Sequence, residues 1–512
     1  MEWYLSYGGE GTGPDRIIDE GEQRAEGVSY APSPPEEFCG REKERERLAT
    51  ILSRAAEHGQ AVMISGPPGI GKSSLLNRLA YEVQENPAGG ESPVLRGEVF
   101  DLPGMIFSVF RDLLKDLRGH AASGRFEGIL GTEGMKEAGR YADDVLEKYA
   151  APVEPVGLLS KTGEEIIGIF ARSPEVGYDR VHQAFDELLR ELGRLMAGTG
   201  RAAAVLLDDV HLASSLDRRL LLDTIHDIPP GILLAFTCRT GDAAGPGREE
   251  IQGLEISQVP LSGMQPHEIR ELAERRFDLS IDDAAAAALL EETGGDPFSL
   301  MACFNALRHR GITPSKETIA DVLAGAEDPA GLALATLPGP EGAWAEGLSV
   351  LNPPFPVPVM GCMLDIPGTS VTDRLQGSSI FRRLPGGEYA FAHPLLQEHC
   401  RRELIPGARV ALNARAADCF ERSMHRLSGR LHVLLSLACH YFHAREYGKA
   451  ADLNLELGLR FHHREDHDTA LVMTERAIVS AEHLGDGALL AAARNQRDLV
   501  RQAITGPVRP VQ

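Results

Sequence analysis

The sequence predicts an α/β fold built on a parallel sheet, followed by regions that are largely or wholly helical. In the first half, short apolar runs typical of buried strands alternate with amphipathic helices, and a glycine-rich turn joins one run to the next helix. In the last part, from Val410 to Ala503, four amphipathic segments are joined by short polar turns. With 512 residues, the chain has room for about three or four domains.

The glycine-rich turn carries the most specific motif. Ala61–Ser65 is apolar, residues 66–73 read GPPGIGKS, which fits G-x-x-x-x-G-K-[ST], and Ser74–Gln84 is amphipathic. Glycines let successive N–H groups point at an anion, and the helix N-terminus adds donors and the positive end of its dipole. The segment therefore predicts a phosphate-binding loop, against the alternative of an ordinary turn before a helix.

This loop predicts a magnesium nucleotide, ATP or ADP with Mg²⁺, as the cofactor. Lys72 is expected to reach the β- and γ-phosphates, and the Ser73 hydroxyl is expected to bind Mg²⁺. The residues expected to surround the phosphates are Gly66, Pro67, Pro68, Gly69, Ile70, Gly71, Lys72, Ser73 and Ser74.

An acidic pair follows a second apolar run. Ala202–Leu207 reads as a buried strand and ends at Asp208-Asp209. Asp208 is expected to hold Mg²⁺ through water, opposite the glycine-rich loop, and Asp209 to orient the attacking water. A solvated acidic turn is the alternative. His211 has no companion at metal-ligand spacing, so a polar loop residue is expected there.

Further predicted strands are Pro93–Phe100, Ile232–Cys238 and Leu254–Val259. The nucleotide is expected at the carboxyl ends of the parallel strands. Residues 119–178 are a Gly-, Glu- and Ala-rich insertion, which reads as a variable helical spacer or as a regulatory or partner surface.

Residues 38–42, Phe-Cys-Gly-Arg-Glu, lie about 25 residues before the glycine-rich loop. They resemble the F-x-G-R-E motif of P-loop ATPases of the STAND and origin-recognition-like classes. The resemblance implies that Arg41 lies at the adenine or ribose side. It also implies that the strand 232–238 lies between the loop strand and the acidic strand, so that Arg239 acts as a sensor arginine. A purely structural role for either arginine is the alternative.

Two further segments resemble the STAND class. Gly295-Asp296-Pro297 matches its Gly-x-Pro element, which makes Pro297 the expected adenine contact, whereas origin-recognition ATPases place an arginine in this region. Residues 392–396, Ala-His-Pro-Leu-Leu, resemble the M-H-D-L-L element, so His393 is expected to bind the β-phosphate in a closed state. Ala replaces Met and Pro replaces Asp in this element, and a structural histidine before a helix is the alternative.

The resemblance and the composition together predict the domain organisation. A hairpin of Ile380–Leu384 and Glu388–Phe391 provides the wing of a winged helix. The predicted parts are a disordered acidic leader (1–36), a P-loop ATPase core (37–262, insertion 119–178), a helical lid (263–329), a winged helix (330–405) and a tetratricopeptide-like helical domain (406–512).

The helical tail is expected to bind protein partners or to self-associate, with a nucleotide-dependent oligomer as one form. Its match to tetratricopeptide repeats is partial, because Ala450 and Ala470 are 20 residues apart and a regular repeat spans about 34 residues.

Composition narrows the partners and the compartment. The formal net charge of −23 disfavours a protein that coats nucleic acid. The seven cysteines include no C-x-x-C spacing, so neither a zinc site nor a disulfide framework is expected, which suits a reducing cytoplasm. No apolar stretch is long enough to predict a membrane span.

The sequence therefore predicts a STAND-type signalling switch that binds ATP and hydrolyses it slowly, because no trans-acting arginine finger is identified. The alternative is a DNA-binding ATPase of origin-recognition or transcription-regulator type, supported by Arg382 and Arg383 on the wing. The chain resembles the large ATP-binding LuxR-family regulators, but no further helix-turn-helix is predicted at the end. A non-hydrolysing scaffold is disfavoured by the intact Asp208-Asp209 pair.

Overall fold

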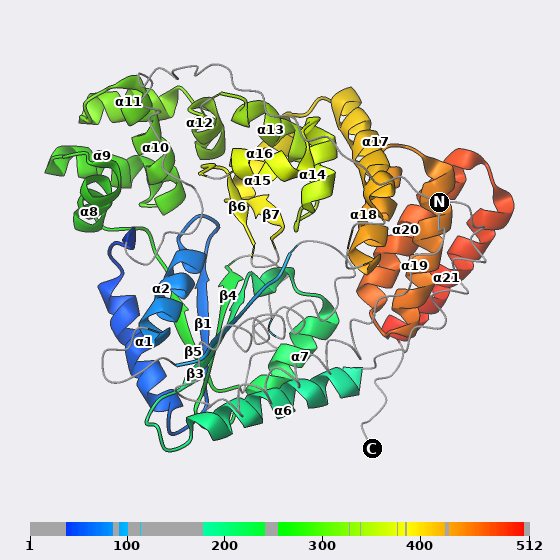
Figure 1. The fold of residues 1–512 in the computed structure, drawn as a ribbon, viewed down its shortest axis with the longest axis horizontal. Coiled ribbons are helices and arrows are strands. Elements are labelled where there is room, and N and C mark those ends of the chain that lie inside the picture. Colours follow the sequence, from blue (N-terminus) through cyan, green and yellow to red (C-terminus); the bar gives the residue numbers. More distant parts are fainter. Residues whose placement is uncertain are drawn as a thin grey trace, which may run out of the picture.

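The computed structural model describes residues 37–84, 92–100, 113, 178–240, 254–326, 328–337, 339–375, 377–384, 387–424, 427 and 430–505. Figure 1 shows a sheet with flanking helices below a helical layer, and a separate stack of helices at the right. The predicted leader and, apart from Tyr178, the predicted insertion lie outside the described residues.

The sheet contains five strands in the order β2-β3-β4-β1-β5, all parallel. The strands are β1 (Gln60–Gly66), β2 (Val94–Glu98), β3 (Ala203–Asp208), β4 (Ile232–Arg239) and β5 (Ile256–Pro260). The predicted α/β class is therefore confirmed, and β4 lies between β1 and β3 as expected. This order brings the glycine-rich loop and the acidic pair to the same edge of the sheet.

Helices cover both faces of the sheet. Because successive side chains of a strand point to opposite faces, Val62 and Ile64 pack with α1 and α2, whereas Ala61 and Met63 belong to the core with α6 and α7. These helices are α1 (Glu42–Ala55), α2 (Lys72–Gln84), α6 (Tyr178–Met196) and α7 (Ser215–Ile225).

A helical block follows the sheet and lies above it in Figure 1. Its helices are α8 (Pro266–Phe277), α9 (Asp283–Thr293), α10 (Pro297–Arg310), α11 (Lys316–Ala324) and α12 (Pro329–Ala335). Helix α10 begins at Pro297 because the Asp296 carboxylate accepts the Ser299 backbone N–H at 2.9 Å, a side-chain cap of the first turn.

A second block contains the predicted hairpin. Its elements are α13 (Glu341–Leu348), α14 (Val357–Leu364), α15 (Gly368–Leu375), β6 (Phe381–Arg383), β7 (Tyr389–Phe391) and α16 (Pro394–Glu403). Strands β6 and β7 are antiparallel, with Phe381 opposite Phe391. One hydrophobic core runs from the α8–α12 helices through this block to α17 and α18. The boundaries at residues 330 and 406 therefore stay predictions.

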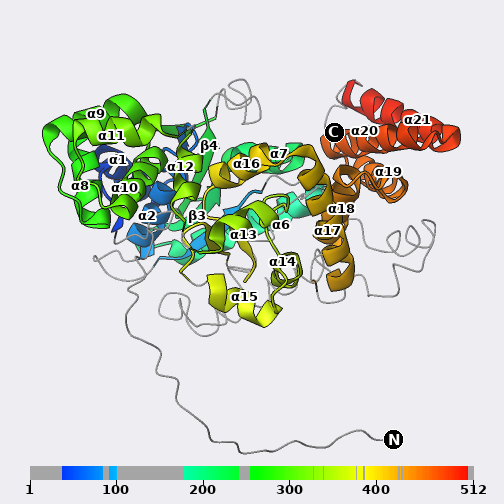
Figure 2. The same ribbon diagram turned by 90° about the horizontal axis from the view of Figure 1, so that it is seen from above.

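The tail is a stack of antiparallel helices, which both views show to one side of the sheet (Figures 1 and 2). Its helices are α17 (Pro406–Ser423), α18 (Arg430–His443), α19 (Tyr447–His463), α20 (His467–Leu484) and α21 (Gly487–Thr505). Helices α19 and α20 approach closely at Gly458, where an added Cβ atom would lie 2.6 Å from the Thr474 hydroxyl oxygen. The four predicted helices of the last part are all present.

The expectation of no disulfide was wrong. Cys362 of α14 and Cys419 of α17 form one, with their Cα atoms 5.6 Å apart. The two cysteines are separated by 57 residues, so no local spacing in the sequence indicates the pair. Disulfides are rare in reducing compartments, so the cysteine content no longer supports a cytoplasmic location. Within the described part of the chain, every helix is too short or too polar to cross a membrane.

Candidate nucleotide-binding site

The loop between β1 and α2 has the backbone conformation that a phosphate-binding loop requires. Gly69 and Gly71 have φ values of 84° and 94°, in the region that favours glycine. The loop is also tightly covered: a Cβ atom on Gly69 would lie 2.6 Å from an Asp296 carboxylate oxygen, and one on Gly71 would lie 3.8 Å from Pro297. The start of α10 therefore lies directly against the loop, which brings the predicted Pro297 to the site.

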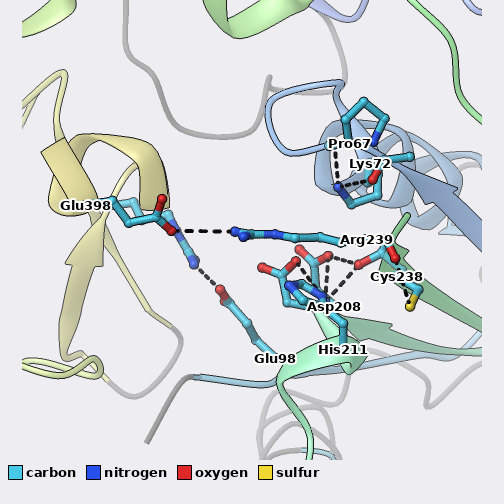
Figure 3. Close-up of polar contacts among 12 residues, drawn as sticks. Pro67, Lys72, Glu98, Asp208, His211, Cys238, Arg239 and Glu398 are labelled. Carbon is cyan, nitrogen blue, oxygen red and sulfur yellow. Dashed lines mark hydrogen bonds and ion pairs between the residues drawn. The ribbon is translucent and has the colours of Figure 1, made fainter. Parts of the chain in front are cut away.

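Lys72 begins α2 and is buried, with 6% of its surface exposed. Its ammonium group donates to the backbone oxygens of Gly66 and Pro67, at 3.1 and 2.9 Å, within the loop itself (Figure 3). Burial lowers the pKa of Lys72, and the nearby charge of Asp209 opposes this effect. The cation is thus desolvated and held at the loop, where a phosphate would gain most from it.

Asp208 stands at the carboxyl end of β3, and its position is fixed by the neighbouring strand. The Thr237 hydroxyl of β4 donates to Asp208 Oδ1, and the Asp209 backbone N–H contacts the same oxygen at 3.1 Å and the Thr237 hydroxyl at 2.8 Å. Thr237 was missed in the sequence, since a buried threonine in an apolar strand gives no signal of its own. It orients the acidic pair.

Asp209 has a left-handed backbone, with φ of 55°. Burial raises the pKa of this carboxyl to about 7, the charges of Asp208 and Glu98 add to the rise, and Lys72 and Arg239 oppose it. A group that titrates near neutral pH suits proton transfer. His211, expected as a polar loop residue, is instead 1% exposed, and its Nδ1 lies 3.7 Å from Asp209 Oδ1.

Glu98 is a third acid at this edge, and the sequence reading missed it. It ends β2 directly opposite Asp208 in the parallel register. Its carboxylate pairs with Arg382 of β6. The predicted strand Pro93–Phe100 left Glu98 inside the strand instead of at its end, and the order of the strands was needed to place it beside Asp208.

Arg239 ends β4 opposite Gly66, the first residue of the loop. Its guanidinium extends across the carboxyl edge of the sheet to Glu398 of α16, with 4.0 Å between the closest atoms (Figure 3). The predicted sensor arginine therefore lies beside the loop and also contacts the block that carries His393.

Arg41 is buried and hydrogen-bonds to the backbone of the glycine-rich loop. Its guanidinium donates to the Ile70 backbone oxygen at 3.1 Å and lies 3.6 Å from the Glu44 carboxylate. Its backbone N–H donates to Glu268 of α8 at 2.7 Å. These contacts hold the segment before α1 between the loop and α8. Contact of Arg41 with a base stays a prediction.

His393 caps α16, and its Nδ1 accepts the Leu395 backbone N–H at 3.2 Å. The ring stacks on Phe298, the residue after Pro297, with ring centroids 4.2 Å apart. Burial lowers the pKa of His393 to about 3, and the positive charges of Arg239, Lys72 and Arg382 add to this. The histidine is therefore neutral and lies near these three cations, although no contact among the described residues joins it to the loop itself.

The residues present fit a magnesium nucleotide. Ser73 lies in the first turn of α2, where helix N–H groups lack intrahelical partners. The Ser73 hydroxyl and the Asp208 carboxylate are oxygen donors of the type that Mg²⁺ prefers. The positive φ values of Gly69 and Gly71 let the loop turn its N–H groups inward, as a phosphate cradle needs.

Comparison with known proteins agrees with this geometry. Residues 37–234 match the family model of the AAA ATPase domain. This segment is similar to AAA ATPase domains.

Curated relatives match over short segments. RuvB subunits of the Holliday junction branch migration complex are 40% identical over 83 residues in Streptomyces griseus and 31% identical over 103 residues in Solibacter usitatus. These alignments cover 14% and 19% of this chain. The chain spans less than a third of the length of these relatives, 23% and 30%.

Two solved structures show wider overlap at low identity. A signal transduction ATPase with numerous domains and a tetratricopeptide repeat sensor, from Pyrococcus horikoshii, is 15% identical, with a TM-score of 0.46 over 93% of this chain and 66% of that one. The ORC1 protein of Aeropyrum pernix, in complex with DNA, is 13% identical, with a TM-score of 0.34 over 72% of this chain and 93% of that one.

Proposed function

We propose that this protein is a STAND-type ATPase switch, in which the nucleotide on the glycine-rich loop controls the position of the block from α13 to α16. One observation carries the proposal: the carboxyl edge of the sheet, with Lys72 and the acidic pair, is in contact with that block through two ion pairs. These are Arg382 with Glu98 and Arg239 with Glu398. The expected outcome of ATP binding or hydrolysis is therefore a change in these contacts.

The proposed reaction is transfer of the γ-phosphoryl group of ATP to water, which yields ADP and phosphate. Lys72 and the N–H groups of the loop bind the β- and γ-phosphates and neutralise charge that develops on them. Mg²⁺, when held by Ser73 and Asp208, adds further charge neutralisation. Asp209 orients the attacking water and takes its proton, a role that fits a carboxyl whose pKa lies near 7.

Arg239 is proposed to contact the γ-phosphate, since it ends the strand next to the loop strand. Turnover is proposed to be slow, because the sequence identifies no arginine finger of the kind that acts on the site of a second subunit. Pro297 is proposed as the adenine contact, Arg41 as a residue at the base or ribose, and His393 as the β-phosphate ligand of the closed state. A cytoplasmic location also stays a prediction.

Substitution of Asp209 tests the reaction. Asp209→Asn is expected to keep binding of ADP and of a non-hydrolysable ATP analogue within about twofold and to lower single-turnover hydrolysis by about 100-fold or more. Asp321→Asn, at an exposed position of α11, is the matched control. Equal turnover of the Asp209 variant and the wild-type protein would favour a scaffold that does not hydrolyse ATP or would move the catalytic role to another residue.

We place partner binding or self-association on the tail, whose helices present several exposed apolar side chains to solvent. These are Leu459, Val472, Val479, Leu484, Leu499 and Ile504. Mass measurement by light scattering with ADP, and with an ATP analogue, tests whether assembly depends on the nucleotide. An unchanged monomer in both would leave partner binding as the proposed role of the tail.

The alternative, a DNA-binding ATPase, has less support from the structure than from the sequence. Of the two hairpin arginines, Arg382 is paired with Glu98, and Arg383 is exposed. A single exposed arginine is a weak basic surface for binding phosphates. DNA binding that falls steeply with rising salt would restore this alternative.

A further inference from the structure

Glu98, Asp208 and Asp209 lie together at the carboxyl edge of the sheet and form its acidic edge. The β6–β7 hairpin contacts the sheet there through an ion pair. Arg382 of β6 pairs with Glu98, which ends β2 and lies opposite Asp208 in the sheet. Glu98 and Arg382 are 284 residues apart in the chain. The side chains of both are 23% exposed, so the pair is partly shielded from water.

The guanidinium of Arg382 is affected by the negative charge of more than one carboxylate. Burial by itself would lower its pKa, but the negative charges of Glu98, Asp208 and Asp209 raise the pKa above its ordinary value. Arg382 is therefore a counter-charge for the whole acidic edge, which includes the carboxylates proposed to hold Mg²⁺ and orient water.

The second contact has the opposite polarity. There the sheet supplies the cation, Arg239, and α16 supplies the acid, Glu398, whose side chain is 55% exposed and 4.0 Å away. Such an exposed pair contributes little to stability. The Arg382–Glu98 pair is more buried and lies within hydrogen-bonding distance, so it is the stronger of the two links.

We propose that Arg382 and Mg²⁺ compete electrostatically for the acidic edge formed by Glu98, Asp208 and Asp209, so that metal binding loosens the hairpin from the sheet. A divalent cation at Asp208 lowers the negative potential that holds the guanidinium, since the interaction of nearby charges is strong where water is partly excluded. The inference rests on the proposed function and deepens it. It names Arg382 as the residue through which the α13–α16 block responds to bound metal.

Thermodynamic linkage turns this into a measurable effect. If Mg²⁺ weakens the contact of Arg382, then loss of Arg382 must strengthen Mg²⁺ binding by the same factor. Loss of Glu98 differs, because it frees the hairpin but also removes a negative charge from the edge. The two substitutions are therefore expected to free the hairpin alike and to affect Mg²⁺ affinity differently.

The test uses the full chain with ADP at a fixed saturating concentration and Mg²⁺ as the titrated probe. Arg382→Ala is expected to tighten the apparent Mg²⁺ dissociation constant about fivefold. It is also expected to raise hydrogen exchange of the peptide 380–392 in the absence of metal. Arg383→Ala, the neighbouring exposed arginine of the same strand, is expected to match the wild-type protein in both measurements.

Glu98→Gln removes the other partner of the same pair. It provides a second test in case Arg382→Ala does not fold. It is expected to raise exchange of the 380–392 peptide without tightening Mg²⁺ binding. The proposal is overturned if both Arg382→Ala and Arg383→Ala give the wild-type Mg²⁺ affinity, or if Glu98→Gln leaves the exchange unchanged. Wild-type protein that binds neither ADP nor Mg²⁺–ADP would overturn the proposed function as well, which separates the two failures.

Discussion

The carboxyl edge of the sheet and the helical tail both bury polar side chains, but the partners of these side chains differ in kind. At the edge, the partners of Lys72 and Asp209 are other charges and backbone groups of a loop, and both pKa values are displaced. In the tail, buried His440 pairs with the Asn413 amide oxygen at 2.9 Å, and Asn454 donates to the Ala450 backbone oxygen at 2.7 Å. The edge is arranged for a ligand, and the tail for packing.

This difference predicts that substitutions at the edge change binding more than stability, and that substitutions in the tail do the reverse. A desolvated charge contributes little to folding unless it is well paired. A buried aromatic side chain, by contrast, stabilises the fold through the area it removes from water.

Lys72→Ala is expected to give the largest separation of binding from stability. It should weaken Mg²⁺–ATP analogue binding by about 100-fold, equivalent to about 2.7 kcal/mol, because the loop loses its charge-assisted contact with the phosphates. The melting temperature should stay the same or rise, since Lys72 is buried and desolvated. Calorimetric titration and thermal unfolding measure the two effects, with exposed Lys316→Ala as the control. Unchanged affinity of the Lys72 variant would remove the basis of the nucleotide site.

Phe461→Ala tests the tail. Phe461 is 1% exposed in a core that includes Leu457 and Met473, so truncation should lower the unfolding free energy by about 3–4 kcal/mol. Leu459→Ala, two residues away and 40% exposed, should cost less than about 1 kcal/mol. Denaturant unfolding followed by circular dichroism gives both values. Nucleotide affinity should stay at the wild-type value in both variants, and a large loss in either would show that the tail and the edge are coupled.

Acid stability should distinguish a histidine at the edge from one in the tail. Burial lowers the pKa of both His393 and His440 to about 3, whereas the unfolded chain binds protons near pH 6.5. Stability should therefore be complete above about pH 6.5 and fall as the pH drops toward 3. Each histidine contributes a loss of about 2.7 kcal/mol at pH 4.5.

Unfolding curves from pH 7 to 4.5 measure this loss, and His440→Gln should reduce its slope. If His393 lies beside the β-phosphate, ADP should reduce its share of the slope, because a nearby anion raises the pKa of a histidine. The share of His440 should not change. An identical slope with and without ADP would place the phosphate away from His393.

Arg239→Ala is expected to have the smallest effect on stability. Its pair with Glu398 spans 4.0 Å to a half-exposed side chain, so its loss should cost well under 1 kcal/mol (about 0.5). Single-turnover hydrolysis should nevertheless fall about tenfold, because Arg239 is proposed to contact the γ-phosphate. Exposed Arg374→Ala is the control. A loss of stability without a loss of turnover would make Arg239 a structural residue.

Local patterns in the sequence were sufficient to predict much of the fold. Apolar runs marked β1, β3 and β4, strands were also predicted over β2 and β5, and the G-x-x-x-x-G-K-[ST] motif placed the loop between β1 and α2. The tail helices were predicted to within a few residues of α18 to α21. Such features depend on the period of apolar residues and on turn chemistry, which are properties of neighbouring residues in the chain.

Local sequence patterns alone specify the class of the fold, the glycine-rich loop and the acidic pair after β3. The tertiary structure sets which distant groups surround that pair: Thr237 beneath Asp208, Glu98 next to it and Arg382 across from it. It also joined Cys362 to Cys419. The physical reason is that strand order and the docking of helical blocks depend on contacts between residues far apart in the chain, and no short pattern encodes those contacts.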